Sequence, residues 1–147
     1  MSSKQMLMIG ALLGALSVSL GALGAHGMKD FLKARSYSSA MVEKYPDPVA
    51  KRLDDWEVAS RYLMYHALAV VACGLLAHSR PSRSLNIAAW FFILGALIFS
   101  GLLYALVLTE KTILGAIVPI GGVSMICGWL SLAWAGGGYC SAECKLN

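Results

Sequence analysis

Two histidines and a group of tyrosines supply most of the side chains that could carry chemistry in this sequence. Arg61, Tyr62, Tyr65 and His66 fall within six consecutive residues, and His26 stands apart from them. Neutral imidazoles can ligate haem or another metal, and an imidazole or a phenol can hydrogen-bond a polar ligand or relay a proton. The same groups can instead join neighbouring helices by hydrogen bonds. Which role applies depends on where the chain places them.

Three more polar residues extend this set further along the chain. Ser100 and Tyr104 are four residues apart, so both would lie on one face of a helix, and Glu110 follows in a short polar segment. An unmatched polar group in hydrocarbon costs several kcal/mol, so such residues should face one another rather than lipid. The full candidate cluster, for a ligand site or for a structural tie, is His26, Arg61, Tyr62, Tyr65, His66, Ser100, Tyr104 and Glu110.

The elements that must position these residues are four long apolar runs. The chain of 147 residues is 58% hydrophobic and only 14% charged, which excludes an ordinary soluble fold. A membrane-spanning helix needs roughly 20 apolar residues, and each run is about that long. We therefore predict an all-α integral membrane protein, one domain over residues 1–147, folded as a four-helix bundle in up-down-up-down order. The predicted spans are residues 6–25, 58–77, 85–108 and 113–135.

Two of these runs have competing interpretations. The run at 58–77 carries Arg61 in its first turn, but a long arginine can extend to the headgroups. Trp56, Tyr62 and Tyr65 also supply the aromatic residues typical of a membrane interface, so we count this run as a span. The run at 6–25 could be a cleaved signal peptide, but it is longer than a usual signal core.

Small residues recur along the first run and predict a helix face that another helix can approach closely. In the fourth run Pro119, followed by Gly121 and Gly122, predicts a kink or a close helix contact. A broken helix can also build a transport site, but no carboxylate lies within any run to couple a proton or a cation. The small residues of the first run are Gly10, Gly14, Ser17, Gly21 and Gly24.

Chain direction predicts where the polar cluster lies. His26 ends the first span and His66 begins the second, so antiparallel helices would bring both to the end of the bundle opposite Met1. Tyr104 should then lie at a depth similar to that of His66, and we predict that these two side chains approach one another. A haem held by His26 and His66 is an alternative, although His66 would lie about 7 Å deeper at 1.5 Å per residue.

The long connection, residues 26–57, carries six basic and six acidic side chains, which argues against nucleic-acid binding. Residues 28–34 mix apolar and basic side chains as a short surface helix does, and Pro46 and Pro48 break the chain before helical spacing resumes. A solvated connection is the simpler interpretation, and a dedicated binding loop is the alternative. Lysine and arginine counts in the loops conflict, so they do not assign either end to the cytoplasm.

The cysteines divide by position. Cys73 and Cys127 lie within spans, where a thiol packs as a small apolar group. Cys140 and Cys144 lie in the C-terminal tail, where they form a disulfide in an oxidising compartment or stay free thiols. Their spacing is not that of a zinc pair, and the sequence has no recognisable nucleophile, phosphate loop or paired catalytic acids. We therefore predict no metal, no cofactor and a protein without catalytic activity.

Several motifs in series resemble those of one known family. That family is domain of unknown function 423, which includes the eukaryotic transmembrane protein 256. The resemblance covers all four spans in order and departs at about residues 36–51 and in the cysteine-bearing tail. It implies a four-helix integral membrane protein with no established reaction. The motifs are 21–27 (GALGAHG), 61–69 (RYLMYHALA), 99–106 (FSGLLYAL), 114–117 (LGAI), 119–122 (PIGG) and 128–130 (GWL).

Two hypotheses for function follow. In the first, the protein is a noncatalytic scaffold or accessory subunit that packs through its glycine-rich helix faces against a second copy or a larger membrane complex. In the alternative, the cluster around His26, His66 and Tyr104 binds a lipid, a quinone-like compound or another small molecule. Both place a multi-pass protein in the lipid bilayer, in a bacterial cytoplasmic membrane or an organelle inner membrane, with no nucleic-acid partner.

Overall fold

The described chain is built from helices. A computed structural model describes the backbone of residues 1–143 and the side chains of residues 1–137. No strand is present in this part of the chain, so the predicted all-α class is confirmed. The elements in order are α1 (Ser3–Leu23), the π-helical turn η1 (Gly24–Met28), α2 (Lys29–Lys33), α3 (Ser39–Lys44), α4 (Pro48–Ser79), α5 (Arg83–Thr109) and α6 (Ile113–Glu143).

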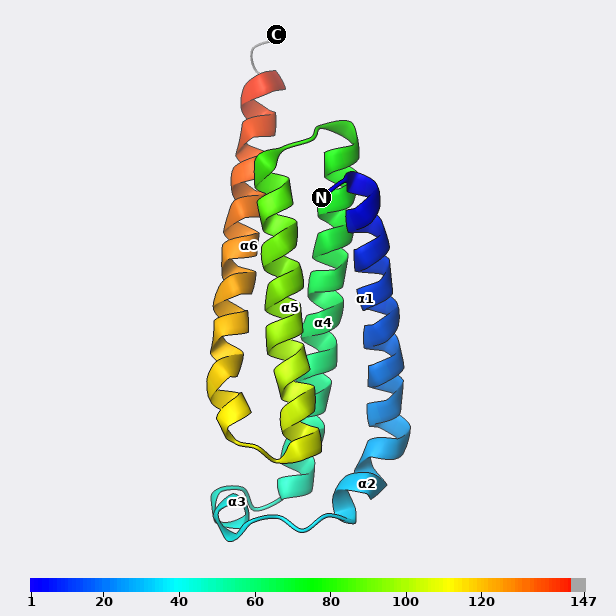
Figure 1. Cartoon of the computed structure of the whole chain (residues 1–147), viewed down its shortest axis with the longest axis vertical. Coiled ribbons are helices and arrows are strands. Elements are labelled where there is room, and N and C mark those ends of the chain that lie inside the picture. Colours follow the sequence, from blue (N-terminus) through cyan, green and yellow to red (C-terminus); the bar gives the residue numbers. More distant parts are fainter. Residues whose placement is uncertain (144–147) are drawn as a thin grey trace.

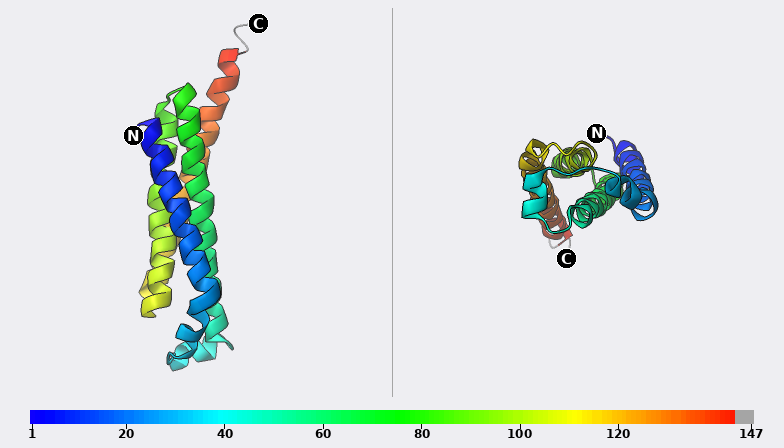
Figure 2. Two further views of the ribbon diagram at one scale, coloured as in Figure 1. Left: turned by 90° about the vertical axis from the view of Figure 1, so that its right-hand side faces the viewer. Right: turned by 90° about the horizontal axis from the view of Figure 1, so that it is seen from below.

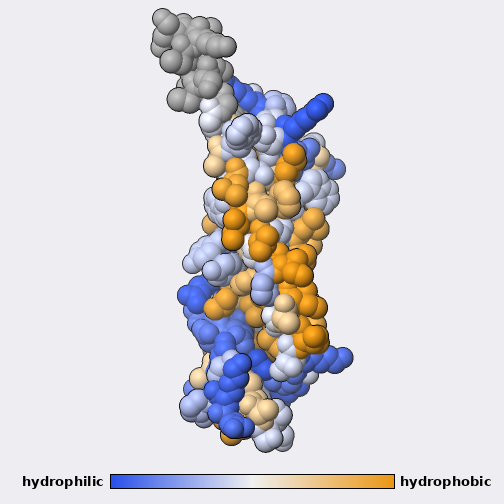
Figure 3. Space-filling model, turned by 90° about the vertical axis from the view of Figure 1, so that its left-hand side faces the viewer, coloured by the Kyte–Doolittle hydropathy of each residue, from blue (hydrophilic) through white to orange (hydrophobic). Residues whose placement is uncertain are grey.

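Four helices among the described residues are long and apolar enough to cross a membrane, as predicted. The first is continuous over Ser3–Lys33 because η1 joins α1 to α2, and α4, α5 and α6 supply the other three. Figure 1 shows that each long helix runs in the opposite direction to the one before it. Apolar side chains cover the middle of the molecule, and hydrophilic ones gather toward its ends (Figure 3).

The helices begin earlier and end later than the apolar runs alone suggest. α4 starts at Pro48 rather than at residue 58, because the Asp47 carboxylate accepts a hydrogen bond from the backbone N–H of Ala50, at 3.0 Å. Proline is favoured in the first helical turn, where its missing N–H would have no partner. The chain does break between α3 and α4, as predicted, but Pro48 begins the new helix instead of preceding it, more than two turns before Trp56.

Residues 28–34 do not form the separate surface helix that their composition suggests. The backbone stays in the right-handed helical region through Leu23, Met28 and Lys29, so hydrogen bonding passes from α1 through η1 into α2. Met28 and Leu32 are buried against Trp56 and Val107. The segment thus extends the first long helix and packs on α4 and α5.

The long helices contact one another mainly in chain order, α1 with α4, α4 with α5, and α5 with α6. Seen from below, α1 lies at one edge of the molecule (Figure 2). The buried share of the most apolar 18-residue segment differs from helix to helix. That share is 17% for the first helix and 22% for α6, but 39% for α4 and 44% for α5. α4 and α5 are therefore the central pair, and α1 and α6 face lipid over most of their surface.

Glycines mark the places where neighbouring helices approach most closely. A Cβ atom added at Gly10 would lie 2.6 Å from Cγ2 of Val71 on α4, and one added at Gly121 would lie 2.6 Å from the backbone nitrogen of Phe99 on α5. Both distances are shorter than real Cβ contacts, so only glycine fits. At Gly122 nothing lies within 4 Å. α6 continues as a helix through Pro119.

The largest apolar cluster takes side chains from all four long helices. Met6 of α1, Val70 and Cys73 of α4 and Phe92 of α5 are fully or almost fully buried, and Ala135 of α6 joins them. Cys73 thus packs as a small apolar group, as its position in a span suggests. In lipid such a cluster stabilises the fold through van der Waals contacts, because the surrounding acyl chains are as apolar as the side chains.

Candidate functional site

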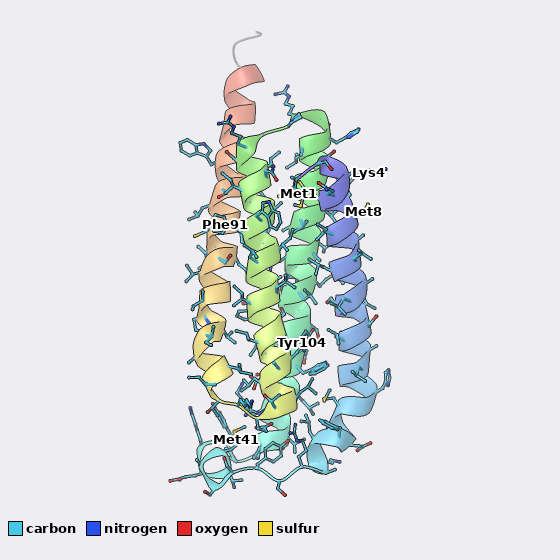
Figure 4. All side chains as sticks on the ribbon, in the orientation of Figure 1. Met1, Lys4, Met8, Met41, Phe91 and Tyr104 are labelled. Atoms are coloured by element: carbon cyan, nitrogen blue, oxygen red, sulfur yellow. The ribbon has the colours of Figure 1, made fainter. Side chains whose placement is uncertain are left out.

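The polar residues singled out in the sequence do not form one cluster. They divide among a set of contacts around His66, a set around Tyr104 and a set around Glu110. Figure 4 marks the two ends of the molecule by Met1 and Met41, and Tyr104 lies in the half nearer Met41. All three sets include residues of α4, but each joins α4 to a different combination of partners, so each is described in turn.

His66 joins α4 to α6. Its Nδ1 atom lies 2.7 Å from the carbonyl oxygen of Tyr62, and its Nε2 atom lies 3.3 Å from the indole Nε1 of Trp129. An indole nitrogen can only donate, so Nε2 accepts and Nδ1 carries the proton that is donated to the carbonyl. Both nitrogens of this buried neutral imidazole are engaged, which leaves no lone pair for iron. The haem hypothesis is therefore not supported.

Aromatic rings surround His66. The ring centroid of Phe92 lies 5.6 Å from that of His66, and the rings of Phe92 and Trp129 meet edge to face at 5.0 Å. The ring of Tyr62 stacks on Phe99 at 4.7 Å. Such pairs add to the packing between helices. The set around His66 thus packs α4, α5 and α6 together.

Tyr104 of α5 is paired with Ser60 rather than with His66. Its hydroxyl lies 2.9 Å from the Ser60 hydroxyl, which donates to the carbonyl of Trp56 at 3.1 Å. The rings of Tyr104 and Trp56 meet edge to face at 4.6 Å. The predicted approach of His66 to Tyr104 is wrong, because Ser60 is the residue of α4 at the depth of Tyr104. His66 lies six residues further along α4, about 9 Å deeper at 1.5 Å per residue.

Ser60 also connects to α1. The Ser17 hydroxyl donates to the carbonyl of Ser60 at 2.8 Å, and the indole N–H of Trp56 donates to the carbonyl of Leu20 at 2.7 Å. A Cβ atom at Gly24 would lie 2.5 Å from Cδ1 of Trp56, so the indole rests directly on this glycine. Two hydrogen bonds and one close contact therefore fix α1 against α4 at this level.

An open cleft of about 520 Å³ lies between α1 and α4 beside these bonds. Three charged residues line it, and the Nε atom of Arg61 lies 3.7 Å from the carboxylate of Glu57, with both side chains more than half exposed. Lys29 is the third. The rest of the wall is small or apolar and consists of Ser17, Gly21, Gly24, Ala25, Leu53, Trp56, Ser60 and Met64.

Glu110 belongs to a buried ion-pair network at the end of the molecule that carries α3. Its carboxylate accepts from Nη2 of Arg52 at 2.7 Å and from Nε at 3.0 Å. Nη1 of Arg52 donates to Asp55 at 3.1 Å, and Lys51 pairs with the same carboxylate. Glu110 is the C-cap of α5 in a left-handed conformation, with φ 58°. The network fastens the start of α4 to the turn between α5 and α6, beside a cavity of about 580 Å³.

The connection between α2 and α3 caps α5. Nη1 of Arg35 donates to the carbonyls of Val107 and Leu108, at 3.1 and 2.8 Å, and these groups lie in the last turn of the helix. A cation is favourable there because the helix dipole is negative at its C-terminus. The Tyr37 hydroxyl donates to the Leu32 carbonyl at 3.1 Å. Burial, and then the nearby Glu110 carboxylate, raise the pKa of Tyr37 above its ordinary value.

Within residues 1–137, the remaining candidates make no hydrogen bond to these three sets, although the ring centroid of Tyr65 lies 6.1 Å from that of Tyr62. His26 is exposed in η1, and 55% of Tyr65 is exposed. Ser100 is buried, and its hydroxyl has no hydrogen-bond partner among the described side chains. The side chain of Cys140 and all of Cys144 lie outside the described residues. In the described part of the chain no group of three histidine, cysteine or acidic side chains is close enough to hold a metal ion.

Sequence reasoning missed three residues that matter in the structure. Arg52 could have been noticed, because it precedes Asp55 by three residues on a helical pattern. Trp129 is distinguished in the sequence only as part of the motif at 128–130. Its partner, His66, is 63 residues away in the chain, so local spacing does not indicate the pairing. Lys29 is in the segment that the sequence predicts as a surface helix, whereas in the structure it directly follows η1 and lines the cleft.

The chain is similar to known proteins over most of its length. The profile of the family described as Protein of unknown function (DUF423) matches residues 20–122. The UPF0382 membrane protein of Staphylococcus epidermidis is 41% identical over 132 residues, which cover 90% of this chain and 94% of that protein. The UPF0382 membrane protein YwdK of Bacillus subtilis is 37% identical over 133 residues, or 90% of this chain and 95% of that one. No solved structure matches at a significant level. With bacterial relatives named membrane proteins and four helices long enough to span a bilayer, this chain is a small membrane protein that belongs to the DUF423 family.

Proposed function

We propose that this chain is a noncatalytic membrane protein that binds one amphipathic molecule of lipid size in the cleft between α1 and α4. The observation that carries the proposal is the cleft itself, with about 520 Å³ of open volume, a largely apolar wall and three charged residues. Cavities of roughly 300–1,000 Å³ with apolar walls and a few polar groups are typical of small-molecule sites.

The cleft runs along the axes of α1 and α4, and Lys29 is the charged residue at the end nearer α3. Lys29 and Leu53 lie at the end nearer α3, and Ser17 and Met64 lie at the end nearer the middle of the long helices. Ser17 and Lys29 are about 18 Å apart along the helix axis at 1.5 Å per residue. An amphiphile would place its head group by Lys29 and its apolar tail along the glycines of α1. That direction matches the polarity of a bilayer leaflet.

The contacts of the glycines favour binding over the scaffold hypothesis. Gly10 and Gly24 of α1 already meet α4, and Gly121 of α6 already meets α5. These three glycines are therefore occupied by contacts within the chain and are not free to pack against another protein. The proposed ligand site does not include His66 or Tyr104, because their polar atoms already bond to other side chains and backbone carbonyls.

A single substitution in the cleft wall tests the proposal. A Cβ atom at Gly21 would lie 3.9 Å from Cβ of Ser60, an ordinary contact, so Gly21→Leu fills the cleft without pushing α1 from α4. Gly101→Leu is the matched control, because nothing lies within 4 Å of its added Cβ and it is exposed on α5. The readout is native mass spectrometry of protein extracted from its membrane in a mild detergent.

We expect the unchanged protein and Gly101→Leu to retain one lipid-sized molecule, and Gly21→Leu to lose it at an unchanged melting temperature. Full retention by Gly21→Leu would refute binding in this cleft. The absence of any retained molecule on the unchanged protein, across several mild detergents, would refute the proposed function as a whole.

A further inference from the structure

We infer that the molecule in the cleft is a phospholipid with a net negative head group, whose phosphate lies between Lys29 and Arg61; this inference rests on the proposed function. Two cations and one anion line the cleft. Arg61 and Glu57 form an ion pair, so the lining of the cleft carries one net positive charge, supplied by Lys29. A phosphodiester monoanion has the complementary charge.

The π-helical turn explains how Lys29 reaches the cleft. In an uninterrupted α-helix residues 28 and 29 would both lie near the face of Gly21, with residue 28 closer to its centre. η1 holds one residue more than a regular turn, so Lys29 takes that angular position instead. Gly21 and Lys29 both line the cleft, whereas Met28 is 4% exposed and packs against Leu32 and Trp56. π turns of this kind occur frequently at functional sites.

Arg61 enters the cleft from α4 near the level of Ser17, because the carbonyl of the preceding residue, Ser60, accepts from the Ser17 hydroxyl at 2.8 Å. Its side chain extends back along α4 to Glu57, in the direction of Lys29. Arg61 lies one turn after Glu57, and its side chain is 51% exposed. A solvent-exposed ion pair at 3.7 Å is weak, so the guanidinium can turn from Glu57 to a phosphate oxygen at little cost. The planar fork of arginine suits bidentate contact with phosphate. Lys29 and Arg61 would then hold one phosphate from two sides.

The charge at Lys29 distinguishes this ligand from a neutral amphiphile. Lys29 forms no ion pair with any residue that the structure describes. A quinone-like molecule would leave this ammonium without a partner at the cleft, whereas a phosphate supplies one. The indole N–H of Trp56 is already donated to Leu20, so its apolar ring is the part that remains for a lipid glycerol or acyl chain.

The test is a lipid competition. Delipidated full-length protein is incubated with an equimolar mixture of phosphatidylglycerol and phosphatidylcholine that carry identical acyl chains, and native mass spectrometry measures the ratio of the two 1:1 complexes. We expect about a fivefold preference for phosphatidylglycerol, on the order of the effect of one lysine or arginine near a membrane surface. Lys29→Gln should abolish the preference, and Lys29→Arg should keep it.

Lys33→Gln is the matched control, since it removes the same charge four residues away in α2 from a side chain that does not line the cleft. It should keep the preference. An equal loss in Lys33→Gln and Lys29→Gln would overturn the inference in favour of unspecific charge attraction. If the two lipids bind equally, and Gly21→Leu binds neither, the inference about the head group is overturned but the proposed function is not. No complex with either lipid would overturn both.

Discussion

The indole N–H of Trp129 on α6 donates to Nε2 of His66 on α4, at 3.3 Å. This bond joins α4 to α6, a pair of helices without the extensive contacts that α4 and α6 each make with α5. The ring of Phe92 from α5 lies beside it. It also sets the tautomer of the imidazole, because the other ring nitrogen must then donate to the carbonyl of Tyr62. His66 is thus a structural histidine that closes α4, α5 and α6 into one packed group.

His66→Phe should lower the free energy of unfolding in detergent by about 1 kcal/mol, because the indole N–H of Trp129 is left without an acceptor in an apolar environment. Trp129→Phe should cost a similar amount. The double variant should cost less than the sum of the two, by roughly 0.5–1.5 kcal/mol. Strictly additive losses, measured by chemical unfolding of the four proteins, would mean that the two side chains do not interact.

Gly10→Ala should destabilise the protein, whereas Gly14→Ala should not. The methyl group added at Gly10 would lie 2.8 Å from the backbone carbonyl oxygen of Ala67, so α1 must move away from α4. At Gly14 the nearest atom is 3.9 Å away, an ordinary contact. We expect a loss of about 1–3 kcal/mol for the first variant and less than about 1 kcal/mol for the second. Thermal melting in one detergent ranks them, and the reverse order would contradict the helix contact.

Glu110→Ala should reduce the free energy of unfolding by about 3 kcal/mol or more, because it leaves the buried Arg52 guanidinium with Asp55 alone as its partner within the network. Glu110→Gly removes the same ion pair but suits the left-handed backbone, φ 58°. It should therefore be about 1 kcal/mol more stable than Glu110→Ala. Urea unfolding of the two variants measures this difference, and equal stabilities would argue against a left-handed residue at this turn.

Thiol labelling should show that the N-terminus and the α4–α5 turn lie on one side of the membrane. The terminal amino group of Met1 lies 3.0 Å from the Oδ1 atom of Asn86, which places the two segments together. In a background without the native cysteines, a membrane-impermeant reagent should label Ser2→Cys and Pro81→Cys alike in intact cells, and Thr112→Cys oppositely. Labelling of all three from one side would mean that α5 does not cross the bilayer.

The four spans could be predicted from sequence because they depend only on the length and polarity of each apolar run. These two properties do not depend on which residues the helix packs against. Side-chain partners depend on how far each helix extends and how it is rotated. α4 begins at Pro48 rather than near residue 58, and an estimate of depth that ignores this places His66 opposite Tyr104 instead of Ser60. Ser60 and His66 are six residues apart on α4, so an error of less than two helical turns in depth was enough to predict the wrong partner for Tyr104.

The angular position of Lys29 at the cleft could not be predicted because it is changed by the π-helical turn. Gly24, Ala25, His26 and Gly27 are compatible with an ordinary helix, and no residue among them signals a wider turn. In a regular helix Met28 would lie on the cleft side, in the place that the structure gives to Lys29. The small residues of α1 did indicate a close approach, but spacing alone could not separate Gly10, which meets α4, from Gly14, which has room around it.

The packing of α1 almost entirely on α4 has a consequence for how the protein enters its membrane. Synthesis proceeds from the N-terminus, so α1 reaches the bilayer before the helix that will cover it has been made. Its insertion must therefore depend on its own apolarity, and the chain has no lysine, arginine or acidic residue between Lys4 and Lys29. α4, which carries Arg61 and His66, is inserted later, when α1 is already in the bilayer and can pack against it. The first helix thus serves as the surface on which a less apolar helix can be accepted into lipid.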